Sequence, residues 1–223
     1  MRSPWLVSVL VGTVGILVAA GFRPCAAEAS TKDSSRASIV VRTYTQPDSE
    51  SAIRTARRTV SAVLGRVGVK VVWLECALPA EVTEASGACT QPLRWNELVV
   101  RIVPAGTAGP EDHLSTLGFA FVDLEAGGGS LATVYADRVR LMAHSAGVDT
   151  AELLGRAMAH EIGHLLLGTN RHASRGLMRA SWSSIDLRRS LATEWLFGGE
   201  EGDVMRRGIA SRLRRWGGVP HSK

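Results

Sequence analysis

Apolar and polar positions follow a strand, helix, strand order at the start of the globular part of the chain. Ile39 to Tyr44 predicts a first strand, and Val69 to Glu75, which is dense in β-branched residues, predicts a second. Between them, Ser51 to Gly65 has apolar residues at helical spacing. Because a strand, a crossover helix and a strand favour parallel pairing, we expect the two strands to be parallel neighbours.

Three further apolar runs complete the predicted sheet. Glu97 to Val103 predicts a third strand, and Leu117 to Asp123 and Leu131 to Ala136 predict two more. The last two runs are separated by Gly127-Gly128-Gly129, a loop that allows a hairpin-like reversal. The pattern therefore predicts a mixed sheet backed by helices.

A later apolar pattern has the period of a buried helix. Asp149 is a good N-cap, and Glu152, three residues later, can complete a capping box. The helix should begin near Thr150 and end at Gly168, since glycine accepts the left-handed conformation that closes many helices. The apolar residues at helical spacing between these ends are Leu153, Leu154, Ala157, Met158, Ile162, Leu165 and Leu166. We expect this helix to be anchored in the core.

The last two turns of this helix carry His160-Glu161-Ile162-Gly163-His164. Histidines at i and i+4 lie one above the other on a helix face, so both imidazoles can reach one metal ion. Glu161 is not needed as a ligand, and in a zinc hydrolase such a carboxylate takes the proton from a water whose pKa the ion has lowered towards ~7. The motif predicts zinc-dependent hydrolysis with Glu161 as general base. The alternative, an accidental motif on a solvated helix, conflicts with the capped apolar helix.

Catalytic zinc usually takes three protein ligands, so a third donor must come from outside the helix. His172 is the best candidate, because it follows Gly168 after a short segment that can fold back beneath the metal. Asn170 is nearer to the helix, but an amide is a poor zinc ligand compared with imidazole. Asp186 and Glu194 are the alternatives, and either would make the site similar to that of zincins with a distant glutamate ligand.

From the helix motif to Met178 the chain resembles the metzincin metallopeptidases, and among them the matrixins most closely. That family has a glycine after its helix, a third histidine in the next loop and a methionine in a tight turn under the metal. Gly168, His172 and Met178 are the matching residues. In the family the glycine and the histidine come three and six residues after the second histidine of the motif, whereas here they come four and eight residues after it. The resemblance implies a Zn²⁺ ion held by His160, His164 and His172 through a loop lengthened by two residues.

The preceding strands also resemble the amino-terminal half of a metzincin domain. Leu117-Gly118-Phe119-Ala120 is similar to the family's edge strand, and Ala132-Thr133-Val134-Tyr135 to the strand beside the active-site helix. The resemblance implies an α+β, zincin-like fold: a mixed, mostly parallel five-stranded sheet with an antiparallel edge strand, and a carboxy-terminal helical part. It also implies that an extended peptide substrate pairs with the edge strand at Gly118, Phe119, Ala120 and Phe121.

The function that follows is peptide-bond hydrolysis by a secreted zinc endopeptidase. Two alternatives remain, a catalytically degenerate zinc-binding or interaction protein on the same scaffold, and a zinc hydrolase whose third ligand is a glutamate. The intact Glu161 argues against the degenerate protein, since a non-catalytic zinc site does not require a general base.

The amino terminus has the pattern of an export signal. Arg2 precedes an apolar run from Trp5 to Ala20, and small residues follow, which predicts a signal peptide over residues 1–29. Residues 30–38 are polar and predict a flexible leader. We expect a secreted or periplasmic protein, with an uncleaved amino-terminal anchor as the alternative.

Without the signal segment the chain has two cysteines, Cys76 and Cys89. A cysteine pair in an exported chain favours a single disulfide. Two zinc thiolates are the alternative, but neither residue is near the histidine motif in sequence. Closing this loop stabilises a fold by about 3 kcal/mol in the chain-entropy model.

The length of the chain predicts one domain over residues 39–216 and a short tail at 217–223. The resemblance implies that this domain is a zinc metallopeptidase-like domain. After Met178 the pattern predicts two helices, at Trp182 to Phe197 and Val204 to Trp216. The net charge is +5, but the excess lies mostly on the carboxy-terminal helix and tail, with few aromatics to stack on bases. We therefore expect a monomer with a peptide or protein substrate, no nucleic acid and no stable membrane insertion after signal cleavage.

Overall fold

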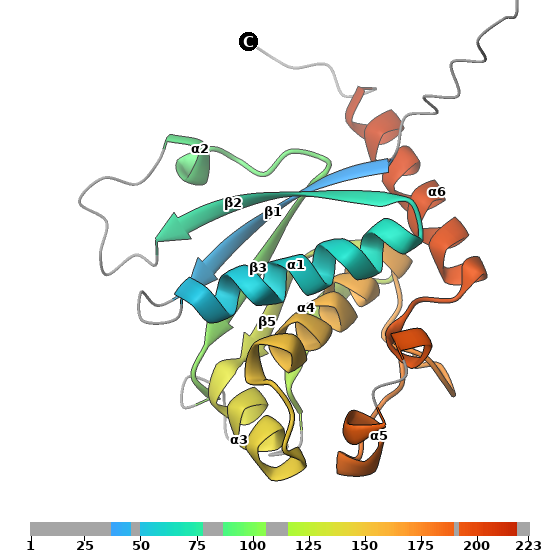
Figure 1. Cartoon of the computed structure of the whole chain (residues 1–223). Helices are drawn as coiled ribbons and strands as arrows, with labels where there is room; N and C mark the ends of the chain where they lie inside the picture. Colours follow the sequence, from blue (N-terminus) through green and yellow to red (C-terminus); the bar gives the residue numbers. More distant parts are fainter. Residues whose placement is uncertain (1–36, 46–49, 78–86, 106–115, 190–191, 218–223) are drawn as a thin grey trace, which may run out of the picture. The chain divides into compact units, whose positions relative to one another are not determined.

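Five strands form one sheet in the order β2-β1-β3-β5-β4. The computed structural model describes residues 37–45, 50–77, 87–105, 116–189 and 192–217 (Figure 1). The strands are β1 (Ala37–Thr45), β2 (Val69–Ala77), β3 (Glu97–Val103), β4 (Gly118–Asp123) and β5 (Gly128–Tyr135). β1 is parallel to β2 and β3, and β3 is parallel to β5, while the edge strand β4 is antiparallel to β5. The predicted fold class, a mixed and mostly parallel five-stranded sheet with an antiparallel edge strand, is confirmed.

Two long helices lie side by side against the sheet. α1 (Glu50–Arg66) connects β1 to β2, and α4 (Thr150–Leu167) packs beside α1 and over β4 and β5 (Figure 1). Gly155 of α4 allows the close approach of the two helices, because a Cβ there would lie 2.7 Å from the backbone oxygen of Ala56. The core between the helices and the sheet includes Val41, Val60, Leu64, Leu98, Val134, Leu154, Met158 and Ile162.

The remaining elements of the described chain are α2 (Gly87–Thr90), α3 (Ala136–Ala146), α5 (Ser184–Arg188), the 3-10 helix η4 (Ala192–Trp195) and α6 (Gly199–Gly217). The single helix predicted from Trp182 to Phe197 is wrong, since α5 and η4 take its place. Ser183 caps α5 in a capping box with Asp186, so the helix cannot begin at Trp182. α3 is not predicted by the sequence pattern above, although Val139, Ala143 and Ala146 have helical spacing and are buried.

The ends of the predicted domain differ slightly from the observed elements. β1 begins at Ala37, so the last two residues of the predicted leader belong to a strand. α6 extends to Gly217, the first residue of the predicted tail. The predicted signal peptide at 1–29 and the rest of the tail lie outside the described residues. Within the described part of the chain, no helix combines the length and the apolar character that a membrane crossing needs.

Cys76, at the end of β2, and Cys89, in α2, form a disulfide with Cα atoms 5.8 Å apart. The backbone around Cys89 is also bound to the sheet through Arg42, whose guanidinium donates to the carbonyl of Gln91 at 2.8 Å and pairs with Glu97. Both members of that ion pair are buried. The disulfide from β2 and the hydrogen bond from Arg42 of β1 therefore hold the same loop against the sheet.

Candidate metal centre

α4 has the ends that the sequence predicts. Asp149 accepts a hydrogen bond from the Glu152 N–H at 2.7 Å, and Gly168 closes the helix with φ +66. In place of the predicted capping box, the Glu152 carboxylate pairs with Arg156 one turn further along the helix. The helix is buried from Leu153 to Leu166, so the motif stands on a fixed element.

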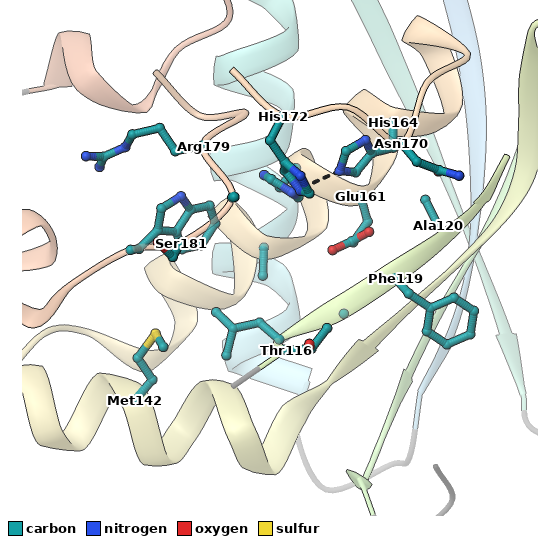
Figure 2. Close-up of a pocket in the computed structure, with 16 residues that line it drawn as sticks. Thr116, Phe119, Ala120, Met142, Glu161, His164, Asn170, His172, Arg179 and Ser181 are labelled. Atoms are coloured by element: carbon teal, nitrogen blue, oxygen red, sulfur yellow. Dashed lines mark hydrogen bonds between the residues drawn. The ribbon is translucent and has the colours of Figure 1, made fainter. Parts of the chain in front are cut away.

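The three predicted histidines lie together above α4. The Nε2 atoms of His160 and His164 are 3.1 Å apart. The ring of His172 lies 5.3 Å from that of His160 and 4.9 Å from that of His164, centroid to centroid. One nitrogen of each of these histidines lies within 4.8 Å of the others. Figure 2 shows the side chains of His164 and His172 converging, with the Glu161 carboxylate beside them.

Backbone carbonyls hold both helix histidines by their other ring nitrogen. Nδ1 of His160 lies 2.9 Å from the oxygen of Leu177, and Nδ1 of His164 lies 2.7 Å from the oxygen of Thr169. A carbonyl only accepts, so each Nδ1 carries the hydrogen and donates it, and each Nε2 keeps its lone pair. Histidines that bind metals are oriented by such bonds.

The donor set fits a zinc ion. Two imidazole nitrogens at ~2.0–2.1 Å from a tetrahedral zinc are about 3.3 Å apart, close to the observed 3.1 Å between His160 and His164. Two lone pairs at this distance repel each other unless a cation lies between them. A proton is disfavoured there, because burial lowers the pKa of His160 to about 4 and also lowers that of His164.

The loop that follows α4 brings His172 to the other two histidines. Gly168 is required where the loop begins, because a Cβ there would lie 2.4 Å from the carbonyl of Gly127 and φ is positive. Thr169 accepts a side-chain hydrogen bond from the Arg171 N–H at 3.1 Å, and the Ala173 N–H donates to the oxygen of Met178 at 2.8 Å. His172 therefore lies between two hydrogen-bonded turns, although its side chain is exposed.

Met178 is buried beneath the two helix histidines. A Cβ at Gly163 would lie only 2.7 Å from its sulfur, so Met178 packs directly on the helix between His160 and His164. The same turn presents the carbonyl of Leu177 to His160. Met178 thus supports the histidines by packing on α4.

Asp186 and Glu194, the alternative third ligands, do not belong to the histidine cluster. Asp186 caps α5 and pairs with Arg179 at 3.2 Å, and its hydrogen bonds with Ser183 lower the pKa of the carboxyl to about 2. Glu194 lies in η4. Among the described residues, the histidine trio is the group of side chains arranged to hold a metal ion.

Glu161 is buried next to the histidines, with 6% of its surface exposed. Burial raises the pKa of its carboxyl to about 8. A cation at the histidines would oppose this shift, because opposite charge favours the carboxylate. A carboxyl balanced between these two effects can both accept and return a proton near neutral pH.

A cleft of about 490 Å³ opens beside the histidines (Figure 2). One wall is β4 with the residues before it, and the other is the segment from Asn170 to Trp182. Helix α4 provides His160, Glu161 and His164. Of the predicted substrate strand, Gly118, Phe119 and Ala120 line the cleft, whereas Phe121, which is 69% exposed, is not among the lining residues. The pairing of this strand with a substrate stays a prediction.

Several lining residues were not predicted as part of the site. They are Thr116, Leu117, Met142, Ala157, Asn170, Arg179, Ala180, Ser181 and Trp182. Met142 comes from α3, a helix that the sequence pattern did not predict. Arg179 directly follows Met178, and this position in the sequence could have placed it at the site. The ring of Trp182 packs edge-on against that of His160, with the ring centroids 5.6 Å apart, so it helps to fix the imidazole.

Solved structures, but not sequence comparisons, give a likeness to known proteins. No model of a protein family matches the chain, and no curated protein sequence matches it. Among solved structures, the chain is similar to archaemetzincin from Methanopyrus kandleri, with 18% identity and a TM-score of 0.45 over 78% of this chain and 97% of that one. A likeness this weak carries no assignment of function, which is therefore inferred from the residues of the site.

Proposed function

We propose that this protein is a zinc-dependent endopeptidase in which Glu161 is the general base. The observation that carries the proposal is a buried carboxylate beside three converging histidines, two of which are oriented by carbonyls, in an open cleft. A site that only stored or sensed zinc would not need Glu161 at this position.

His160, His164 and His172 would hold the ion, which when bound supplies a nucleophilic water and polarises the scissile carbonyl. Glu161 would accept the proton of the attacking water and pass it to the leaving amine. The surrounding apolar residues of α4 keep bulk water from the carboxylate, which strengthens its interactions with the reacting groups.

A peptide is the substrate that the cleft favours. β4 is the edge strand of the sheet in the described part of the chain, and an extended peptide could add to that edge as a further strand. Gly118, Phe119 and Ala120 of that strand line the cleft that contains Glu161. A peptide bound there would lie beside the reacting groups.

We also propose that the protein acts outside the cytoplasm. The amino-terminal sequence pattern supports this, and so does the disulfide between Cys76 and Cys89, because such bonds persist in oxidising compartments.

The test compares wild type, Glu161→Gln and Glu152→Gln for zinc content and for cleavage of a fluorogenic peptide library. Glu161→Gln should keep one zinc per chain and lose about 10²- to 10⁴-fold in kcat, the usual contribution of a general base. Glu152→Gln, the same change on the same helix, should keep both zinc and activity.

Two results would contradict the proposal. Peptidase activity retained in Glu161→Gln would show that this carboxylate is not the base. A zinc-loaded wild type that cleaves no peptide in the library would favour the interaction-protein alternative.

A further inference from the structure

Gly118, the first residue of β4, lies against the side chain of Glu161. A Cβ at this position would be 3.1 Å from both Cγ and Oε1 of Glu161, and 2.6 Å from the backbone oxygen of Thr133. The residue itself is buried, and a Cβ would point at these atoms of Glu161 and Thr133. Any larger residue would therefore displace the carboxylate, the strand, or both.

Space, not backbone conformation, accounts for glycine at this position. The φ angle of Gly118 is not positive. The described glycines with a positive φ are Gly68, Gly127, Gly147, Gly168 and Gly176. Its backbone cannot move away easily, since it pairs with Val134 and the adjacent Leu117 accepts a hydrogen bond from the Tyr135 N–H at 2.8 Å. The strand is fixed on β5 at the point where it meets Glu161.

The carboxylate has equally little freedom on its own side. Glu161 stands on the buried face of α4, between the two helix histidines in sequence, and both Gly118 and Glu161 line the same cleft. Its position beside the reacting groups therefore depends on the volume that Gly118 leaves open.

We propose that Gly118 is a positioning residue, whose missing side chain leaves the space that places the Glu161 carboxylate between the edge strand and the histidines. The proposal rests on the proposed role of Glu161 as general base. It gives the first residue of the edge strand a part in proton transfer, in addition to any contact with the substrate.

Gly118→Ala tests the proposal, with Gly129→Ala as the matched control. A Cβ at Gly129 would lie 2.1 Å from the oxygen of Phe121 and 2.7 Å from Leu165, so this variant also forces β4 and β5 apart, at the other end of the pair. Zinc content, the free energy of unfolding, kcat and KM are measured for both variants.

Both variants should unfold more easily, but their kinetics should differ. Gly118→Ala should retain one zinc per chain and lose at least about 10-fold in kcat with a small change in KM, because a misplacement of ~1 Å can cost 10²-fold. Gly129→Ala should keep the kcat of wild type. An unchanged kcat in Gly118→Ala, or an equal loss in both variants, would overturn the proposal.

A double-mutant cycle separates positioning from general damage. Glu161→Asp keeps a Cγ but removes the Oε1 contact with a Cβ at position 118. Gly118→Ala should therefore cost less kcat in the Glu161→Asp background than in wild type. Additive losses in the cycle would contradict the proposal.

A crystal structure of Gly118→Ala gives a readout that does not depend on turnover. A Glu161 carboxylate displaced relative to wild type supports the inference, and an unmoved carboxylate overturns it. If wild type cleaves no peptide, the proposed function fails, while this structural result still decides the inference about Gly118.

Discussion

His172 is held differently from the other two histidines of the site. His160 and His164 are buried and each donates from Nδ1 to a carbonyl, whereas His172 is exposed on the loop. His172→Ala would leave two preorganised nitrogens without the third donor of a catalytic zinc site. We expect at least a ~100-fold loss of zinc affinity, since even the loss of an outer hydrogen-bond partner costs 10- to 100-fold.

Competition with a fluorescent chelator measures this loss, and Asn170→Ala is the control. Asn170 lines the same cleft but offers an amide, which is a poor zinc ligand compared with imidazole, so its variant should bind zinc like wild type. If zinc were lost in Asn170→Ala but retained in His172→Ala, Asn170 and not His172 would be the third ligand.

The raised pKa of Glu161 makes a prediction about the stability of the metal-free protein. Burial raises this pKa from 4.5 to about 8, so between these values the folded chain binds a proton that the unfolded chain releases. The stabilisation from that proton is fully present below pH 4.5 and is lost as pH rises through about 8. Glu161→Gln, which stays neutral, should avoid this loss.

Guanidinium unfolding in EDTA at pH 5, 6.5 and 8 measures the effect. Relative to wild type, Glu161→Gln should gain stability as pH rises, by at most ~1.4 kcal/mol per pH unit. The comparison with Glu161→Gln isolates this carboxyl, because the lowered pKa of His160 acts equally in both proteins. A difference that does not vary with pH would show that the carboxyl is already ionised when the site is metal-free.

At the scale of the elements, α4 and the turn that carries Met178 form a single packed unit. Gly163 is the contact point, because a Cβ there would lie 2.7 Å from the sulfur of Met178 and 2.8 Å from the ring of Phe197. Both neighbours are buried and cannot move aside freely. We expect Gly163→Ala to lower the free energy of unfolding by about 1–3 kcal/mol, despite the better helix propensity of alanine.

Gly65→Ala is the matched control, since nothing lies within 4 Å of a Cβ at this position in the last turn of α1. That variant should be as stable as wild type or up to ~1 kcal/mol more stable. Denaturant unfolding of both variants decides the point. A Gly163→Ala protein that matches Gly65→Ala in stability would show that the helix and the turn are not tightly packed at Gly163.

Elements with strong local periodicity could be predicted from the sequence, and the rest could not. The five strands, α1 and α4 follow from apolar spacing, and the ends of α4 follow from Asp149 and Gly168. The helix predicted from Trp182 is not observed, because the capping box of Ser183 begins a separate helix, α5, at the next residue. His172 could be proposed as the third ligand, because among the side chains of the loop after α4 imidazole is the best zinc ligand. Met142 enters the cleft only through the packing of α3, which local pattern does not reveal.

At the scale of the whole molecule, the disulfide and the cleft lie at opposite edges of the sheet. β2, at one edge, carries Cys76 of the disulfide, whereas β4, at the other edge, lines the cleft. The candidate site is thus separated by the full width of the sheet from the covalent link. α6, the last element of the described chain, packs on α4, the helix that carries the site.

Arg212 links α6 to the end of α4 and to β5. One of its nitrogens, Nη2, donates to the oxygen of Leu165 at 2.7 Å, in the last turn of α4, and to that of Gly129 at 2.8 Å, in β5. Arg212→Met would remove both bonds while keeping most of the apolar stem. Because bonds from a charged donor contribute about 1.5–3 kcal/mol, we expect a loss of that order in the free energy of unfolding.

Arg214→Met is the control for this variant, because Arg214 is exposed on the same helix and the change removes the same charge. It should alter stability by less than about 0.5 kcal/mol. Hydrogen exchange shows where the structure is weakened. In Arg212→Met the amides in the last turn of α4 should exchange faster, because the Leu165 carbonyl has lost its hydrogen bond from Arg212. Equal stability of the two variants would mean that α6 is held by its apolar face, with Met205 and Ile209 buried against the core, and that the last turn of α4 needs no support from Arg212.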